Sequence, residues 1–282
     1  MKIGIASYAY FNRYGVEAGL QKMREHGYEA TDFQGFVRSS SALFAMDEQT
    51  FCASLAELKR LADANGIEIN QAHGPWRWPS MDYTKEQRSE RFDKMARALQ
   101  GCALLGCKNL VIHPLMPYGR CEIDRRVVEE INAEHFTRLA DVGREYGVTV
   151  CLENMPFRNQ FLSRPAELFG FVKELNHSHI RMCLDTGHCT MFGISPADAV
   201  RTIGKDCLRA LHVHDNDGVQ DQHLLPMCGV IDWTEFSRAL AEIGFDGVFS
   251  LETCVEKIAP CEDCREAEEK KLALLATRLA NG

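Results

Sequence analysis

The sequence has no long hydrophobic run. Its uninterrupted apolar stretches are only a few residues long, whereas a membrane-spanning helix needs about 20 apolar residues. Its first residues, from Met1 to Tyr8, follow a strand-like pattern and show neither the apolar segment nor the cleavage site of a signal peptide. We therefore expect a cytoplasmic protein that does not associate with a membrane.

Positive charge is also scarce. The 32 lysines and arginines are outnumbered by 40 aspartates and glutamates, which gives a net charge of −8. Proteins that bind nucleic acid nonspecifically usually carry an excess of basic residues, so the overall charge gives no support for such a surface, although a local groove could still be basic. The remaining composition, with 45% hydrophobic and 26% charged residues, is that of a globular protein and excludes disordered and fibrous classes.

Cysteine is less frequent than in disulfide-stabilised secreted scaffolds, since 12 cysteines in 282 residues fall well below the roughly 8–10% of that class. Most lie in apolar patterns, where a free thiol packs as a small hydrophobic group. Cys254, Cys261 and Cys264 differ, because they form a Cys-x6-Cys-x2-Cys sequence near the C-terminus. A structural zinc site needs a fourth ligand that the sequence does not identify. We therefore expect reduced thiols here, with a metal or iron–sulfur site as the alternative.

Short β-rich segments alternate with amphipathic helical segments eight times along the chain. The expected strands are Lys2–Ala6, Ala30–Phe33, Ile67–Ala72, Asn109–His113, Thr149–Glu153, Ile180–Asp185, Leu208–His214 and Gly247–Glu252. The expected helices span 14–26, 48–65, 84–106, 124–146, 164–175, 195–204, 232–243 and 263–280. This alternation predicts an α/β protein with a single (β/α)8 TIM-barrel domain over residues 1–282. A doubly wound sheet is the alternative, but residues 7–11, after the first strand, lack the glycines of a phosphate-binding loop.

Residues that can ligate a metal stand at the ends of these strands, where the active site of a TIM barrel lies. The third to eighth expected strands end, in chain order, at His73, His113, Glu153, Asp185, His214 and Glu252. His188, Asp221 and His223 follow the sixth and seventh strands. A single histidine or glutamate at such a position is usually a satisfied polar residue. Six consecutive strands that end in a ligand-type residue instead predict a metal centre.

Four of these strand-end segments, 152–154, 184–188, 211–217 and 251–253, resemble the xylose-isomerase-like TIM-barrel superfamily. The resemblance extends from the first strand to the last and therefore covers the whole chain. This superfamily includes sugar and sugar-phosphate isomerases and epimerases, inositol-degrading enzymes, and abasic-site nucleases of the endonuclease IV type. The resemblance implies a metal-dependent enzyme but says little about its substrate.

Resemblance to the ketose 3-epimerase branch implies one divalent cation held by Glu153, Asp185, His214 and Glu252. Glu153 and Glu252 would then act as acid and base beside a carbonyl group, through an enediolate, and His188 would contact a sugar hydroxyl. Three carboxylates and one histidine suit Mn²⁺, Mg²⁺, Co²⁺ or Zn²⁺, and the oxygen-rich set favours manganese. We therefore expect a cytoplasmic isomerase or epimerase that acts on a sugar or polyol derivative.

Two histidines compete for one place in this expected ligand set. His212 and His214 stand two residues apart on the seventh expected strand. We expect their side chains to point to opposite sides of the strand, so that only one of them faces the barrel mouth. The resemblance assigns the metal to His214, and His212 would then pack behind it.

Three further side chains are candidates for substrate binding. Trp76 and Trp78 follow His73, where their rings could stack on a sugar; a rigid lid or a dimer contact is an equally good interpretation. Arg158 could bind an anionic group, although an arginine at such a position is usually a surface residue. The chain also departs from the ketose 3-epimerases, which carry an arginine where this sequence has Gln220. The length and phosphorylation of the sugar therefore stay open.

The same strand ends also match a multi-zinc phosphodiesterase. Endonuclease IV-type enzymes hold three zinc ions with nine ligands, and nucleic acid would be a partner under this alternative. By position the ligands are His73, His113, Glu153, Asp185, His188, His214, Asp221, His223 and Glu252. The loops after the second and third strands lack the dense lysine and arginine that grip a duplex backbone, which favours the sugar enzyme. A lyase or dehydratase acting on a sugar derivative is the third hypothesis, and a homo-oligomer is expected on base rates alone.

Overall fold

The computed structural model describes residues 1–76, 82–117, 124–253, 255 and 261–281. Eight parallel strands form one sheet in the order β7-β6-β5-β4-β3-β2-β1-β8. The strands are β1 (Ile3–Ala6), β2 (Ala30–Phe33), β3 (Glu68–His73), β4 (Asn109–Ile112), β5 (Thr149–Glu153), β6 (Ile180–Asp185), β7 (Leu208–His212) and β8 (Phe249–Leu251). Hydrogen bonds from Val213 N to Ser250 O (2.8 Å) and from Glu252 N to Val213 O (3.0 Å) join the two edges of the sheet. The predicted (β/α)8 barrel is confirmed.

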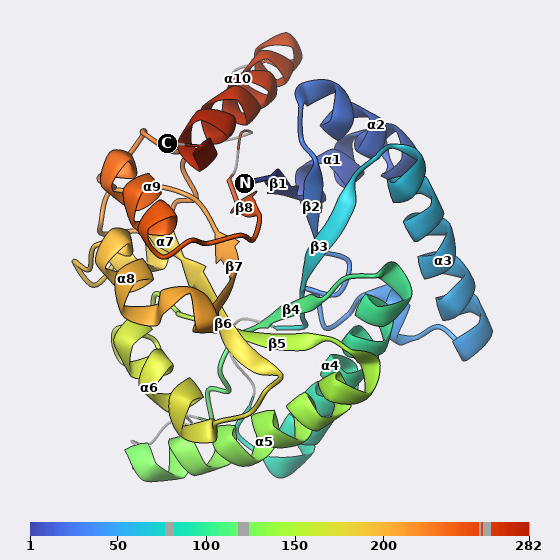
Figure 1. The fold of residues 1–282 in the computed structure, drawn as a ribbon. Coiled ribbons are helices and arrows are strands. Elements are labelled where there is room, and N and C mark those ends of the chain that lie inside the picture. The colour runs from blue at the N-terminus through green and yellow to red at the C-terminus, as the bar shows by residue number, and fades with distance from the viewer. Residues whose placement is uncertain (77–81, 118–123, 254, 256–260, 282) are drawn as a thin grey trace.

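Helices surround this barrel, and the C-terminal helix α10 lies between α9 and α2 in the outer ring (Figure 1). The helices are α1 (Ser7–Tyr14), α2 (Val16–His26), the 3-10 turn η1 (Ala42–Phe44), α3 (Glu48–Ala64), α4 (Lys85–Leu105), α5 (Arg125–Tyr146), α6 (Pro165–Leu175), α7 (Thr186–Thr190), α8 (Pro196–Cys207), α9 (Trp233–Glu242) and α10 (Glu262–Asn281). All eight expected helices are present, with ends within three residues of the prediction. No helix in the described ranges is long and apolar enough to cross a membrane.

Local hydrogen bonds at the helix ends fix where each loop at the barrel rim begins and ends. Before α4, the Thr84 hydroxyl accepts from Gln87 N (3.2 Å) and the Gln87 side chain accepts from Thr84 N (3.1 Å). Helices α4 and α5 each end at a glycine in the left-handed region, Gly106 (φ 68°) and Gly147 (φ 67°), which other residues adopt only with strain. The short helices α1 and α7 were not expected, because α1 follows β1 without a capping side chain and α7 has too few residues to show a periodic pattern.

The barrel has an apolar layer both outside and inside its strands. Outside, large side chains fill the space between strands and helices, among them the fully buried Phe36, Phe51, Phe136 and Phe236. Inside, four small side chains form a separate buried cluster, one from each of β4 to β7: Val111, Cys151, Cys183 and Ala210. Each exposes at most 1% of its surface. This inner cluster forms the floor of the site described next.

Candidate metal centre at the barrel mouth

The side-chain alternation of the strands places the polar residues directly above the inner apolar cluster. Residues two apart on a strand project from the same face. The residues two positions after the four members of that cluster are, in order, His113, Glu153, Asp185 and His212. Each of these four exposes 4% or less of its surface. The barrel interior therefore changes within one layer from apolar side chains to a ring of buried imidazoles and carboxylates.

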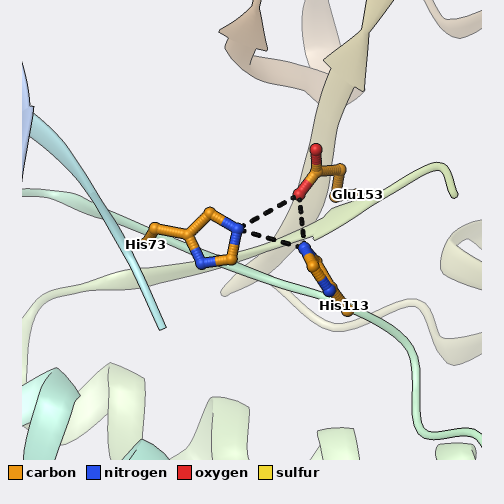
Figure 2. A group of neighbouring side chains, drawn as sticks. All are labelled: His73, His113 and Glu153. Carbon is orange, nitrogen blue, oxygen red and sulfur yellow. Dashed lines mark hydrogen bonds and ion pairs between the residues drawn. The ribbon is translucent and has the colours of Figure 1, made fainter. Parts of the chain in front are cut away.

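One group in this ring consists of His73 at the end of β3, His113 after β4 and Glu153 at the end of β5 (Figure 2). His73 Nε2 lies 3.0 Å from His113 Nε2, and Glu153 Oε2 lies 3.1 Å from His113 Nε2 and 3.6 Å from His73 Nε2. His73 Nδ1 is 2.8 Å from Gly74 O, so its Nδ1–H donates there and its Nε2 keeps a lone pair for the site. Two nitrogens and one oxygen thus converge from three strands.

The protonation of this group follows from its burial. Burial lowers the pKa of His113 to about 4, although the carboxylate of Glu153 acts in the opposite direction. The Glu153 Oε2 atom is buried, and its described neighbours are the Nε2 atoms of His113 and His73 at 3.1 Å and 3.6 Å. A neutral imidazole beside a buried carboxylate oxygen is a donor set that a cation would complete.

A second group lies at the centre of the mouth, where Glu153, Asp185, His212 and Glu252 bring ligand atoms within 4.8 Å of one another. His212 Nδ1 is 2.7 Å from Glu153 Oε1, and His212 Nε2 is 2.9 Å from Asp32 Oδ2. Although burial opposes a charge on its ring, nearby groups including the carboxylates of Glu153 and Glu252 raise the pKa of His212 well above its usual value. Both ring nitrogens of His212 therefore already face carboxylates.

His212 and His214 both face the mouth, so the prediction that they point to opposite sides was wrong. The physical reason is the period of a strand, which returns every second side chain to the same face. His214 Nε2 lies 3.0 Å from Asp185 Oδ2, one layer above His212. Its ring is so close to Gly187 that an added Cβ would lie 2.0 Å from His214 Cε1. Only a glycine leaves room for the His214 ring at this place.

A third group lies beside His214 and is made by the loops after β6 and β7. His188 Nε2 and His223 Nε2 lie 3.4 Å and 3.5 Å from the two oxygens of Asp221. The His214 and His223 rings stack with centroids 4.0 Å apart. Burial opposes charge on these imidazoles, but the surrounding carboxylates, Asp221 and Asp185 among them, raise the pKa of His188 to about 9 and that of His223 to about 10. All nine predicted ligand positions therefore lie in one connected cluster.

A buried ion pair supports the loop that carries His113. Arg91 in α4 donates from Nη1 to Asp82 Oδ2 (2.5 Å) and from Nη2 to the His113 carbonyl (3.1 Å). Asp82 Oδ2 also accepts from Met116 N (3.0 Å). Arg91 and Asp82 expose only 8% and 2% of their surfaces. The loop after β4 is thus fixed from behind by two charged side chains that the sequence gave no reason to single out.

Of the predicted substrate-binding residues that the structure describes, Trp76 lies at the barrel mouth and Arg158 does not. Trp76 packs on His113, with ring centroids 4.8 Å apart, and therefore lies at the mouth. Arg158 is exposed and donates to Met191 O (2.5 Å); it lines a surface cavity of about 480 Å³ that contains none of the candidate ligands. The structure does not bring Arg158 together with the metal centre. Trp78 lies outside the described residues.

Two residues of the site were missed by the sequence interpretation. Asp32 near the end of β2 contacts His212, and Gln34 just beyond it donates from Nε2 to Glu252 Oε1 (3.4 Å). A signal existed, because Asp32 stands near the end of the second expected strand, as the predicted ligands stand at the ends of the third to eighth. Gln34 has no such signal, since a glutamine is not a common metal ligand.

The chain is similar in sequence to proteins of known family. A family model described as a xylose isomerase-like TIM barrel matches residues 20–276. The chain is 28% identical over 245 residues to D-psicose 3-epimerase of Ruminiclostridium cellulolyticum (84% of this chain, 77% of that protein). It is 31% identical over 214 residues to D-psicose 3-epimerase of Enterocloster bolteae (74% and 69%).

Solved structures share the whole fold at lower sequence identity. D-psicose 3-epimerase with D-tagatose from Clostridium cellulolyticum H10 superposes with a TM-score of 0.81 at 23% identity, over 99% of both chains. The IOLI protein, solved with a bound zinc atom, superposes with a TM-score of 0.77 at 18% identity, over 100% of this chain and 98% of that one. At these sequence identities the similarity shows a shared fold alone.

Proposed function

Because the chain belongs to the xylose isomerase-like TIM barrel family, we propose that it is a divalent-metal-dependent isomerase or epimerase for a sugar or polyol derivative. The psicose 3-epimerase relatives support the substrate class, and the zinc atom in the IOLI structure supports a bound metal. The observation that carries the proposal is the convergence of Glu153, Asp185 and Glu252 with buried histidines at the carboxyl end of the barrel.

The contacts of the two histidines support a choice between them as the fourth ligand. Both nitrogens of His212 face carboxylate oxygens, at 2.7 Å and 2.9 Å, so this ring has no lone pair to offer. His214 presents Nε2 toward Asp185, and its Nδ1 lies 3.4 Å from the carbonyl of Asp215 on the other side. We assign the ion to Glu153, Asp185, His214 and Glu252, while His212 holds the carboxylate of Glu153. Manganese suits this oxygen-rich set best, and magnesium, cobalt or zinc are also compatible.

A bound divalent cation would supply the charge that stabilises an enediolate next to the substrate carbonyl. Glu153 and Glu252 would remove and return the proton, one from each face of the substrate. Glu252 is the more accessible of the two, with 19% of its side chain exposed against 2% for Glu153. His188, fixed by its Nδ1 at 2.7 Å from Asn154 O, would donate from Nε2 to a substrate hydroxyl. Trp76 would cover one side of the substrate and exclude water.

The other ligand groups extend this proposal. His73 and His113 with Glu153 Oε2 form a nitrogen-rich set that suits zinc, and these three residues would hold a second ion. Asp221 and His223 lie beside His214 and could hold a further ion or contact the substrate. The proposed chemistry needs only the first ion.

The test combines metal analysis with isotope exchange. Protein purified without added metal or chelator is analysed for metal per chain and then incubated with a panel of ketoses, inososes and oxidised sugars in D₂O. The proposal expects at least one bound ion and deuterium at the carbon beside the carbonyl of one substrate, together with its isomer. Stoichiometric bound metal without exchange on any panel member would overturn it. Net release of water or of an aglycone would instead establish a lyase.

A multi-zinc phosphodiesterase is the second candidate, because the three groups together contain all nine positions expected of a trinuclear site. It predicts close to three tightly held zinc ions per chain and cleavage of duplex DNA that contains an abasic site. The same purified protein answers both questions. Cleavage of such DNA without any isotope exchange on sugars would replace the first proposal by the second.

A further inference from the structure

Two cysteine sulfurs lie in contact far from the metal centre. Cys261 stands just before the first residue of α10, and Cys264 lies in its first turn. Their Sγ atoms are 3.0 Å apart, a separation about 1 Å longer than a disulfide bond. The spacing Cys-x2-Cys at a helix N-terminus lets the two side chains meet without any change in the helix.

The two sulfurs differ in their surroundings. Cys261 is exposed, whereas Cys264 is partly buried and packs against the hydrophobic core. Hydrogen bonds from the thiol and the backbone N–H of Cys264 lower the pKa of Cys261, and the same contact raises the pKa of Cys264. An exposed thiol of lowered pKa beside a partly buried thiol is the arrangement in which one cysteine attacks and the other resolves.

Metal binding is the other use of such a pair, and the structure gives it no support. No group of three or more ligand atoms within the described residues includes either sulfur. Cys254, the third cysteine of the sequence pattern, lies outside the described residues. The helix that carries the pair is held in place, because Arg13 of α1 pairs with Glu269 of α10 at 3.0 Å. Among the described residues, each of the two sulfurs therefore has the other as its sulfur partner, at the start of an anchored helix.

We propose that Cys261 and Cys264 form a thiol–disulfide exchange site for disulfides of low molecular weight. The Cys261 thiolate attacks one sulfur of the disulfide RSSR, forms a mixed disulfide and releases RS⁻. The Cys264 thiol gives its proton to that leaving thiolate, attacks Sγ of Cys261 and expels the second RS⁻, which takes up the proton first lost by Cys261. The net change is two cysteine thiols plus RSSR to one protein disulfide plus two RSH. This site is independent of the proposed function.

The test uses the metal-loaded protein and glutathione redox buffers, with acid quenching, maleimide labelling and peptide mass spectrometry. In the natural sequence the peptide that contains Cys261 and Cys264 should lose two hydrogens as the ratio of oxidised to reduced glutathione rises. Cys264→Ser should instead trap glutathione on Cys261. Cys261→Ser should accumulate at least tenfold less adduct on Cys264, because the attacking thiolate is gone. Cys228→Ser is the matched control, since Cys228 is also exposed, and should leave the pair unchanged.

Three results would overturn this proposal. The first is a Cys264→Ser variant that carries no more glutathione on Cys261 than on Cys228. The second is that Cys261 and Cys264 both remain alkylatable in the most oxidising buffer. The third is a disulfide that joins either sulfur to Cys254 instead. A circular dichroism spectrum of each variant, identical to that of the natural protein, ensures that a negative result reports on the thiols and not on misfolding.

Discussion

Histidines on the two sides of the barrel mouth are similarly buried beside carboxylates, yet their pKa values shift in opposite directions. On the β3–β5 side, His113 has its pKa lowered to about 4 by burial. On the β6–β7 side, the pKa of His188 is raised to about 9 despite burial, because Asp185, Asp221 and Glu153 surround it. A third histidine, His135 in the helix layer, gives a reference without a carboxylate: burial and nearby arginines lower its pKa to about 3.

This comparison shows that the number of carboxylates, more than the depth of burial, determines the charge of these histidines. One carboxylate does not outweigh the effect of burial on the pKa of His113, whereas three carboxylates reverse the direction of the pKa shift at His188. On the β3–β5 side His113 therefore favours its neutral form, whereas on the β6–β7 side His188 and His223 favour the imidazolium form beside carboxylates. Four experiments test this contrast between the two sides, and they follow in decreasing order of expected effect.

The largest effect is expected from Glu153→Gln, because Glu153 faces His113 with one oxygen and His212 with the other. Loss of the carboxylate removes a proton-transferring group and a ligand of both proposed ions, so turnover should fall by about 10³-fold or more. Deuterium exchange and product formation measure it, with the exposed Glu68→Gln as control. Turnover within tenfold of the natural protein would contradict the assignment of Glu153.

Arg91→Met should weaken the β3–β5 side alone. It removes the buried cation that pairs with Asp82 Oδ2, at a cost of about 3 kcal/mol in the free energy of unfolding, measured by urea titration. The freed His113 carbonyl should also loosen the loop after β4 and lower metal content at that side. The double variant Asp82→Asn, Arg91→Met should recover part of the stability. A double variant as unstable as Arg91→Met would show that the buried charge is not the cause.

His113→Asn and His188→Asn form a matched pair, one from each side. His188→Asn should lower kcat by about 10²-fold, because it removes a donor to the substrate, while His113→Asn should lower it by no more than about tenfold. Metal analysis should show one ion fewer in His113→Asn. Equal losses of kcat in both variants would mean that the two sides act as one unit. Unchanged metal content in His113→Asn would argue against an ion on the β3–β5 side and against the trinuclear alternative.

His135→Phe tests the reference histidine and has the smallest expected effect. The pKa of His135 is about 6.5 in the unfolded chain and about 3 in the folded protein. Between these two pH values the unfolded chain binds more protons than the folded protein. The free energy of unfolding therefore decreases as the pH falls through this range. Between pH 7.5 and 5 this one residue should contribute a loss of about 2 kcal/mol. The urea midpoints measured at pH 7.5 and pH 5 should differ less in His135→Phe than in the natural protein. The new ring would pack with Phe92 and Phe136, which the imidazole contacts now. An equal pH dependence in both proteins would refute this account.

The sequence was sufficient to predict the fold and the position of the polar residues at the strand ends, because both depend on local pattern. Alternating apolar and polar segments predict the strands, and Glu153 and Asp185 are the last residues of β5 and β6 as expected. The pairing of His212 with Asp32 could not be predicted in this way, since 180 residues separate them and only barrel closure brings β2 and β7 to the same interior. The Asp82–Arg91 pair was missed for a similar reason, because it acts through the backbone of a third segment.

The floor of small side chains beneath the ligands has a kinetic consequence. Val111, Cys151, Cys183 and Ala210 close the barrel interior with at most 1% of their surface exposed. Under the proposed function this floor would leave the mouth as the route for substrate and product. An isomer just formed would then compete with incoming substrate for the same site, so each of two interconverting compounds should act as a competitive inhibitor of the other.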